Sequence, residues 1–307
     1  MTRSWLVPAL WLTLASCAFA ACPPAGQDRA SLQALKAEKF AMPDATARNA
    51  LAEGLLDCLG DADPTLRDGI AYEAFSTWMR AGAFDPDELR KLRDGLYARL
   101  DGEDADGFRK PFAALVLSEV ARTDRVSPWM RADERAAMVE RASAYLESVR
   151  DYRGYENGAG WRHGVAHGAD WAMQLALDPA LDRAQLERLL AAVAAQVMAA
   201  DGHAYVFGEG ERLARPVLYA ARRGLIDDAA WKAWFAALPA RLGPPQAGHG
   251  DAAWLARRHD LAQFLEDAYA SADLSQDPAI SRLAPAIAAA LPAMPRPPRW
   301  TPPAAAA

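Results

Sequence analysis

The sequence is short of several residue types and motifs from which function is often diagnosed. It has three cysteines, five histidines and only five lysines against 29 arginines in 307 residues. The basic residues are scattered among 40 acidic ones, so nucleic-acid binding is not expected. No segment after the first twenty residues is apolar for long enough to cross a bilayer, which predicts no integral membrane segment in the mature chain. The Gly-x-Ser-x-Gly, P-loop and dinucleotide-binding patterns are absent, so no motif marks an enzyme class.

The N-terminus has the pattern of a secretory signal peptide. One basic residue, Arg3, precedes an apolar run over 5–14, and small residues end in Ala18-Phe19-Ala20. This predicts cleavage after residue 20 and a periplasmic or secreted protein. The alternative is a lipoprotein, in which Leu14-Ala15-Ser16-Cys17 is a lipobox and Cys17 is lipidated. The clean A-x-A signal favours soluble export.

Two cysteines remain once Cys17 is removed or lipidated. Cys22 and Cys58 are then an even pair in an oxidising compartment, which predicts a disulfide between the extended N-terminus and the end of the second expected helix. Such a bridge would contribute about 3 kcal/mol by restricting the unfolded chain. The alternative is two free thiols, which exported proteins rarely keep.

Helix signals occur along nearly the whole chain, and no convincing strand pattern does. Its 52% hydrophobic content and net charge of -6 are typical of a globular, mildly acidic protein with a large core. Asp63-Pro64 and Asp85-Pro86 each place an N-cap acid before a proline at the first helical position. Apolar residues then recur at helical spacing, as Leu66, Ile70, Ala74 and Trp78, and as Leu89, Leu92, Leu96 and Leu100.

The same two-helix unit repeats along the chain. The later pairs are expected over 108–121 with 132–149, 161–177 with 182–200, 212–223 with 227–238, and 254–270 with 278–291. Repeat starts lie roughly 40 to 50 residues apart, the period of HEAT and armadillo repeats. We therefore expect an all-α fold of stacked helical hairpins forming a HEAT/armadillo-like α-α superhelix. The expected parts are a signal peptide (1–20), N-terminal helices with Cys22 and Cys58 (21–62), the repeat domain (63–291) and a disordered Pro/Ala-rich tail (292–307).

One expected helix carries an unusual polar line. On a helical wheel, His163, His167, Asp170 and Gln174 fall within one narrow stripe. The rest of the wheel is largely apolar, and there is no Lys, Glu or Arg from residue 163 to 177. A helix with this pattern is expected to be buried, with its polar line facing a groove or a neighbouring helix.

Three roles suit this polar line. As metal ligands, His163, His167 and Asp170 would supply three N/O donors and leave a position open, as in catalytic zinc sites. The general-base glutamate of the H-E-x-x-H motif is absent, because Gly164 holds its place. No cofactor is certain, and a divalent metal such as zinc is the candidate.

The other two roles need no metal. A histidine held by Asp170 would act in acid–base chemistry with Tyr155, Glu156 or Arg162 on a glycan or peptide. Alternatively, the line is structural, a ladder of side chains hydrogen-bonded to the preceding helix or to the 151–160 loop.

Two further segments are candidates for the same site. The loop over 151–160 is long, rich in aromatic and charged residues, and leads into the histidine helix. In a stacked array the first helices of successive repeats lie side by side, so a charged cluster that opens a later repeat is expected near the polar line. That cluster consists of Glu209, Glu211, Arg212 and Arg215, and Arg257, His259, Asp260 and Gln263 would extend the same surface.

Several blocks resemble a bacterial family, domain of unknown function 2785. They are Leu66-Arg67-Asp68-Gly69-Ile70-Ala71-Tyr72, Arg153-Gly154-Tyr155, Gly160-Trp161-Arg162-His163, Ala166-His167 and the stretch from Gly208 to Ala214. The resemblance covers about residues 50 to 265. It implies an all-α, repeat-like domain and brings no assigned activity.

These patterns lead to one functional hypothesis and two alternatives. The hypothesis is an exported helical-repeat protein that binds a peptide, protein or envelope ligand in a groove around His163, His167 and Asp170. The alternatives are a metal-assisted hydrolase or lyase acting on envelope glycan or peptide, and a purely structural ladder with no site. If both imidazoles are sealed from solvent, the binding hypothesis for this groove and the enzyme alternative are removed together. The candidate ligand-binding residues are Arg153, Tyr155, Glu156, Trp161, His163, His167, Asp170, Gln174, Glu211 and Arg212.

Overall fold

A computed structural model describes residues 22–243 and 251–295, and the regular structure in them is almost entirely helical. The all-α prediction is therefore confirmed. The expected signal peptide, Cys17 and all but the first four residues of the expected tail lie outside the described residues. Among the helices that are described, none combines the length and the apolar character needed to cross a membrane.

The N-terminal segment is tied to the rest of the chain by a disulfide. Helices α1 (Arg29–Ala37) and α2 (Ala45–Leu55) begin at the N-caps Asp28 and Asp44, whose carboxylates accept backbone N–H groups. Cys58 lies in a 3-10 helix, Asp57–Gly60, directly after α2. Its sulfur bonds to that of Cys22, with the two Cα atoms 5.0 Å apart. The expected Cys22–Cys58 disulfide is confirmed.

The first hairpin begins where the Asp-Pro pairs predict. Asp63 caps α3 (Pro64–Leu66), which continues through a π-helical turn (Arg67–Tyr72) into α4 (Glu73–Arg80). Asp85 caps α5 (Pro86–Asp101) in the same way. The four-residue spacing of apolar side chains does not predict the π-helical turn. The turn begins at Arg67, whose side chain is fully buried.

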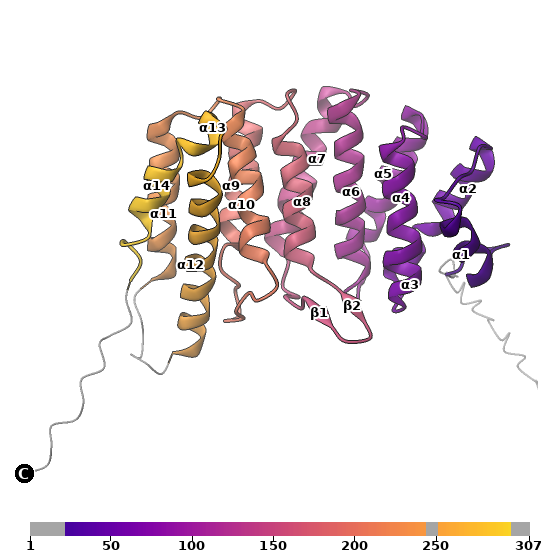
Figure 1. The fold of residues 1–307 in the computed structure, drawn as a ribbon, viewed down its shortest axis with the longest axis horizontal. Coiled ribbons are helices and arrows are strands. Elements are labelled where there is room, and N and C mark those ends of the chain that lie inside the picture. Colours follow the sequence, from indigo (N-terminus) through magenta and orange to yellow (C-terminus); the bar gives the residue numbers. More distant parts are fainter. Residues whose placement is uncertain (1–21, 244–250, 296–307) are drawn as a thin grey trace, which may run out of the picture.

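The later helices stand side by side along the long axis of the molecule (Figure 1). In one layer α6 packs on α8, α8 on α10, and α10 on α12; in the other, α7 packs on α9. The first helices of successive hairpins are thus neighbours, as the repeat pattern predicts. These helices are α6 (Arg109–Val126), α7 (Ala132–Ser148), α8 (Gly164–Ala176), α9 (Arg183–Gln196), α10 (Glu209–Arg222) and α12 (Ala252–Asp273).

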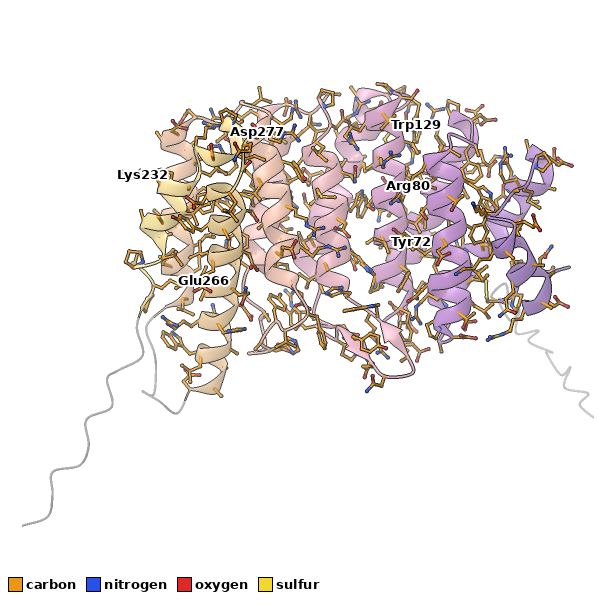
Figure 2. All side chains as sticks on the ribbon, in the orientation of Figure 1. Tyr72, Arg80, Trp129, Lys232, Glu266 and Asp277 are labelled. Atoms are coloured by element: carbon orange, nitrogen blue, oxygen red, sulfur yellow. A yellow bond between two sulfur atoms is a disulfide. The ribbon has the colours of Figure 1, made fainter. Side chains whose placement is uncertain are left out.

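The C-terminal end of the described chain completes the last pair. Helix α11 (Asp228–Leu242) packs on α14 (Ala284–Ala290), which also contacts α12, and the short α13 (Pro278–Ser281) contacts α10. Side chains fill the space between the helices along the whole array (Figure 2). The HEAT-like superhelical form and the domain boundaries at 62/63 and 291/292 stay predictions.

Candidate functional site

The candidate site begins at a small β-hairpin that precedes α8 at one edge of the array (Figure 1). Strands β1 (Tyr155–Glu156) and β2 (Gly160–Trp161) are antiparallel, and Tyr155 lies opposite Trp161. The pairing continues as Arg162 N donates to Gly154 O and His163 N donates to Arg153 O. The expected 151–160 loop is therefore an ordered hairpin that delivers the chain to α8.

His163 lies before the helix on which it was expected. Its backbone has φ 56° and ψ 39°, the left-handed region, and α8 starts at Gly164. The wheel that begins the helix at Trp161 and places His163 in phase with His167 is wrong at this point. The cause is the hairpin, because its pairing holds the chain extended as far as residue 162 and the left-handed residue then turns it into the helix.

Three exposed aromatic rings meet above His163, and we call Tyr155, Trp161 and Phe207 the aromatic corner. Trp161 is 5.2 Å from Tyr155 and 5.9 Å from Phe207 between ring centroids, at interplanar angles of 60° and 86°. The three residues are 44%, 38% and 37% exposed. Two separate segments therefore bring together three rings that are each partly exposed to solvent.

The aromatic corner rests on a buried pair of polar side chains. The His163 ring stacks on Trp161 with centroids 4.7 Å apart, and its Nε2 lies 3.5 Å from Glu209 Oε1. Glu209 Oε2 accepts the backbone N–H of Phe207 at 2.9 Å. Burial raises the pKa of Glu209, but His163 and backbone N–H groups outweigh it and leave the pKa below its usual value. An ionised Glu209 thus holds Trp161, through His163, and Phe207.

His167 lies in the protein interior. Its Nδ1 donates to Pro111 O on α6 at 3.2 Å, and its ring meets Phe112 edge-on at 5.2 Å. Burial, followed by electrostatic repulsion from His163 and Arg212, lowers the pKa of His167 well below its ordinary value. His167 is therefore a neutral imidazole joining α8 to α6.

The other two members of the polar line also contact neighbouring helices. Arg212 on α10 reaches both oxygens of Asp170, with its Nε 2.9 Å from Oδ1. Burial raises the pKa of Asp170, and the Arg212 contact offsets part of that rise. Gln174 accepts from the guanidinium of Arg125 on α6 at 3.2 and 3.3 Å. The expected approach of the Arg212 cluster to the polar line is present.

The polar line is largely shielded from solvent. His163, His167 and Asp170 are 7%, 6% and 8% exposed. Within residues 22–243 and 251–295, no group of three or more His, Cys, Asp or Glu side chains is arranged to hold a metal ion. The three donors expected to form a zinc site instead bind a carboxylate, a backbone carbonyl and a guanidinium.

The charged residues of the hairpin are held by local partners. Arg153 pairs with Asp151, and Glu156 pairs with Arg162. The Arg162 guanidinium lies 4.2 Å from the Phe108 ring centroid, and the Arg67 guanidinium lies 4.0 Å from the same centroid. These contacts fasten the hairpin to the start of α6.

Arg67 is the residue that sequence reasoning missed in fastening the hairpin. It donates to Ala159 O at 2.7 Å and to Asp68 Oδ1 at 2.7 Å, and its side chain is fully buried. Burial lowers its pKa, and Asp68 opposes that shift. The one signal for it in the sequence is its place inside the Leu66–Tyr72 family block.

A pocket of about 430 Å³ lies beside the aromatic corner, between residues 205–211 and α12. Its polar lining is Glu209, Glu211, His259, Gln263 and Asp267. Burial, with repulsion from Glu211 and Glu266, raises the pKa of Asp267 despite a hydrogen bond from Gln263. Glu211, His259 and Gln263 are sequence candidates; Phe207 and Asp267 are not, since neither belongs to a motif.

Comparisons with known proteins give one family match. The family model described as "Protein of unknown function (DUF2785)" matches residues 96–269, which include the hairpin, the aromatic corner and α8 to most of α12. No curated protein and no solved structure matches the chain.

Proposed function

The chain belongs to the DUF2785 family of proteins of unknown function, and from this premise we propose that it is a peptide-binding protein. The ligand is an extended segment that places a large apolar side chain in the aromatic corner and a nearby Lys or Arg side chain in the adjacent pocket lined by Glu209, Glu211 and Asp267. The observation that carries the proposal is the aromatic corner, three rings each more than one third exposed.

Exposed rings that cluster are typical of a recognition surface. Aromatic side chains supply large contact areas at low entropic cost and are enriched at interfaces. Here the rings are held before any ligand arrives, because His163 stacks on Trp161 and Glu209 holds the backbone at Phe207. With mutual angles of 60° and 86°, the rings do not share a plane and offer no common flat face to a sugar ring.

Charge favours a basic residue beside the apolar one. Of the polar groups that line the pocket, three are carboxylates and none is a Lys or Arg. Glu211 is paired with Arg215, while Asp267 has a raised pKa because burial and neighbouring acids disfavour its charge. A cation entering the pocket would relieve that repulsion and could also contact the faces of the rings.

We assign the His167, Asp170 and Gln174 contacts a positioning role in this proposal. They join α8 to α6 and α10, and so set the relative positions of the two segments that carry the aromatic corner. A metal-assisted reaction is not proposed, because Arg212 engages Asp170 and Pro111 O engages His167. Export fits the proposal, since the disulfide and the absence of a membrane-crossing helix in the described chain are compatible with a secreted protein.

An array of immobilised pentapeptides Gly-Xaa-Gly-Zaa-Gly, with a second set carrying one more spacer glycine, tests the proposal. We expect retention to peak with Leu, Met or Phe at Xaa and Lys or Arg at Zaa. Selection of acidic Zaa, or no preference at either position, would contradict it. A set of chitin oligosaccharides is the comparison ligand, and preferential binding of these would replace the peptide by a glycan.

Variants locate the binding. Phe207→Ala removes one ring, and Gly154→Ala displaces the same ring because an added Cβ would overlap it. Each variant is expected to bind the selected peptide about tenfold more weakly, which corresponds to a loss of about 1.4 kcal/mol in binding free energy. Asp267→Asn should reduce only the preference for a basic Zaa. The control is Leu274→Ala, which removes a 77% exposed apolar side chain after the end of α12 and should leave binding unchanged.

A further inference from the structure

A second pocket lies where α4 ends, α5 begins and α6 ends. Its volume is about 200 Å³, and its apolar lining is Met79, Phe84, Leu89, Val126 and Trp129. Figure 2 labels Trp129 and Arg80 beside the α4–α6 part of the array. We call it the α4–α6 pocket.

Trp129 gives the pocket a fixed wall. Its indole Nε1 donates to Thr123 Oγ1 at 3.0 Å, and its backbone N–H donates to Asp124 Oδ1 at 2.8 Å. The Arg90 guanidinium covers the ring, 5.4 Å from its centroid. At the rim, Val126 is 60% exposed, so apolar surface extends from the pocket into solvent.

Two guanidinium groups line the same pocket, and they differ in their partners. Arg80 is paired with Glu119, whose Oε2 accepts from Nε at 3.0 Å. Arg122 has no hydrogen bond or ion pair among the described side chains and backbone. Its charge is therefore available to a ligand in the pocket.

The surroundings of Arg122 add positive charge instead of cancelling it. Arg125, one helical turn further along α6, binds only the amide oxygen of Gln174. Burial lowers the pKa of Arg125 and repulsion from Arg122 lowers it further, while the charge of Asp178 opposes both effects. Asp124, on the same turn, is engaged by Arg135 and by the backbone of Trp129 and Met130. The partial negative charge at the end of α6 is about half a unit, which does not balance two cations.

We propose that the α4–α6 pocket binds a small carboxylate with an apolar body the size of one benzene ring. The ring lies against Leu89 and Trp129, and the carboxylate takes two hydrogen bonds from the Arg122 guanidinium, the geometry in which arginine binds carboxylates. The size follows from the volume, because an engineered apolar cavity of about 150 Å³ in another protein holds benzene. The site is separate from the aromatic corner and does not depend on the proposed function.

Ligand-observed ¹⁹F NMR on the full chain tests this proposal. The probe is 4-fluorophenylacetate, compared with its neutral amide and with 4-fluorophenethylamine, which share the ring and differ in charge. We expect the carboxylate to bind with a Kd of about 1 mM or tighter, a range set by the number of its heavy atoms. The amide should bind at least tenfold more weakly, and the amine should show no binding.

Two variants with the same change of charge test the residue. Arg122→Gln should bind the carboxylate at least tenfold more weakly than the wild type. Arg125→Gln, which lies one turn away and outside the pocket lining, should change the Kd less than threefold. Thermal unfolding confirms that both variants are folded. No binding at 5 mM probe, equal binding of acid and amide, or equal affinity in wild type and Arg122→Gln would overturn the proposal.

Discussion

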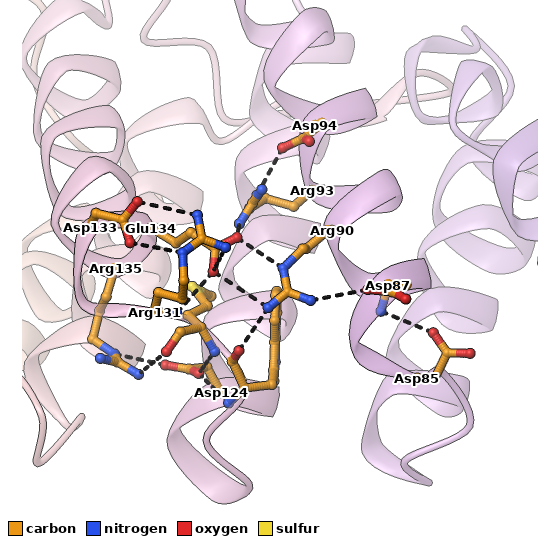
Figure 3. A network of polar contacts seen from close by, with 12 residues as sticks. Asp85, Asp87, Arg90, Arg93, Asp94, Asp124, Arg131, Asp133, Glu134 and Arg135 are labelled. Atoms are coloured by element: carbon orange, nitrogen blue, oxygen red, sulfur yellow. Dashed lines mark hydrogen bonds and ion pairs between the residues drawn. The ribbon is translucent and has the colours of Figure 1, made fainter.

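Replacing Glu134 by glutamine should remove a pH-dependent contribution to stability where α5 meets α7. Figure 3 shows Glu134 between several arginines. Its Oε1 accepts from Arg90 Nε at 2.9 Å and from Arg93 at 3.0 Å, and its Oε2 accepts the backbone N–H of Arg131 at 2.9 Å. The Glu134 side chain is 7% exposed, so water can replace few of these hydrogen bonds if the carboxylate loses its charge.

The magnitude follows from the pKa. Burial alone would raise the pKa of Glu134, but the Arg90, Arg131 and Arg93 hydrogen bonds outweigh it and lower the pKa from 4.5 to about 2. Because the folded pKa lies below the unfolded one, the contribution is complete above pH 4.5 and is lost as the pH falls towards 2. Folded and unfolded pKa values of about 2 and 4.5 correspond to about 3 kcal/mol at pH 7 and about 1 kcal/mol at pH 3.

Urea unfolding at pH 7 and pH 3 measures this contribution in wild type and Glu134→Gln. The difference in free energy of unfolding between wild type and Glu134→Gln should be about 2 kcal/mol smaller at pH 3 than at pH 7. The control is Glu140→Gln on the same helix, where the side chain is 65% exposed and pairs with Arg188. Its free energy of unfolding should differ from that of the wild type by under about 1 kcal/mol at both pH values. If the Glu134→Gln difference is the same at pH 7 and pH 3, the reasoning about this network is refuted.

Two further predictions concern the polar line. Arg212→Met should destabilise the fold by about 3 kcal/mol at pH 7, because it leaves the Asp170 carboxylate buried without its partner. That loss should decrease towards pH 4, since the raised pKa of Asp170 then allows it to take up a proton; a loss independent of pH in urea unfolding would contradict this. His163→Asn should be more stable than His163→Val by about 1–2 kcal/mol, since asparagine tolerates the left-handed backbone and valine does not. Equal stability of the two variants in the same assay would show that the backbone at residue 163 carries no such constraint.

Local chemistry explains which parts of the fold were predictable. The helix starts at Asp63-Pro64 and Asp85-Pro86 depend on a cap and a ring within three residues, so they are evident in the sequence. The all-α fold follows from apolar spacing in the same way. The π-helical turn at Arg67 does not, because its stabilising contacts come from the hairpin far along the chain.

The candidate site was predictable in its members and less so in its geometry. Sequence spacing indicated that His163, His167, Asp170 and Arg212 belong together. In the structure the two histidine rings are in contact, Arg212 binds Asp170, and the charge of Arg212 lowers the pKa of His167. It placed His163 on the helix, because no short-range signal shows that Arg67 and Phe108 fasten a hairpin there. Phe207 was missed for a similar reason, since a ring in an irregular segment has no period to reveal it.

The contacts of α8 have a consequence for the repeats as units. His167 and Gln174 bind α6, whereas Asp170 binds α10, so the contacts of α8 with its two neighbours use different chemistry. In consensus repeat proteins, neighbouring units share one interface and can be duplicated, deleted or exchanged. If the α8 hairpin were duplicated, the first copy of α8 would pack against the second copy instead of α10. The second copy has no arginine that could take the place of Arg212, so Asp170 of the first copy would have no guanidinium partner. The order of the hairpins is therefore favoured by their side chains, because copying the central unit would leave one buried Asp170 carboxylate without its guanidinium partner.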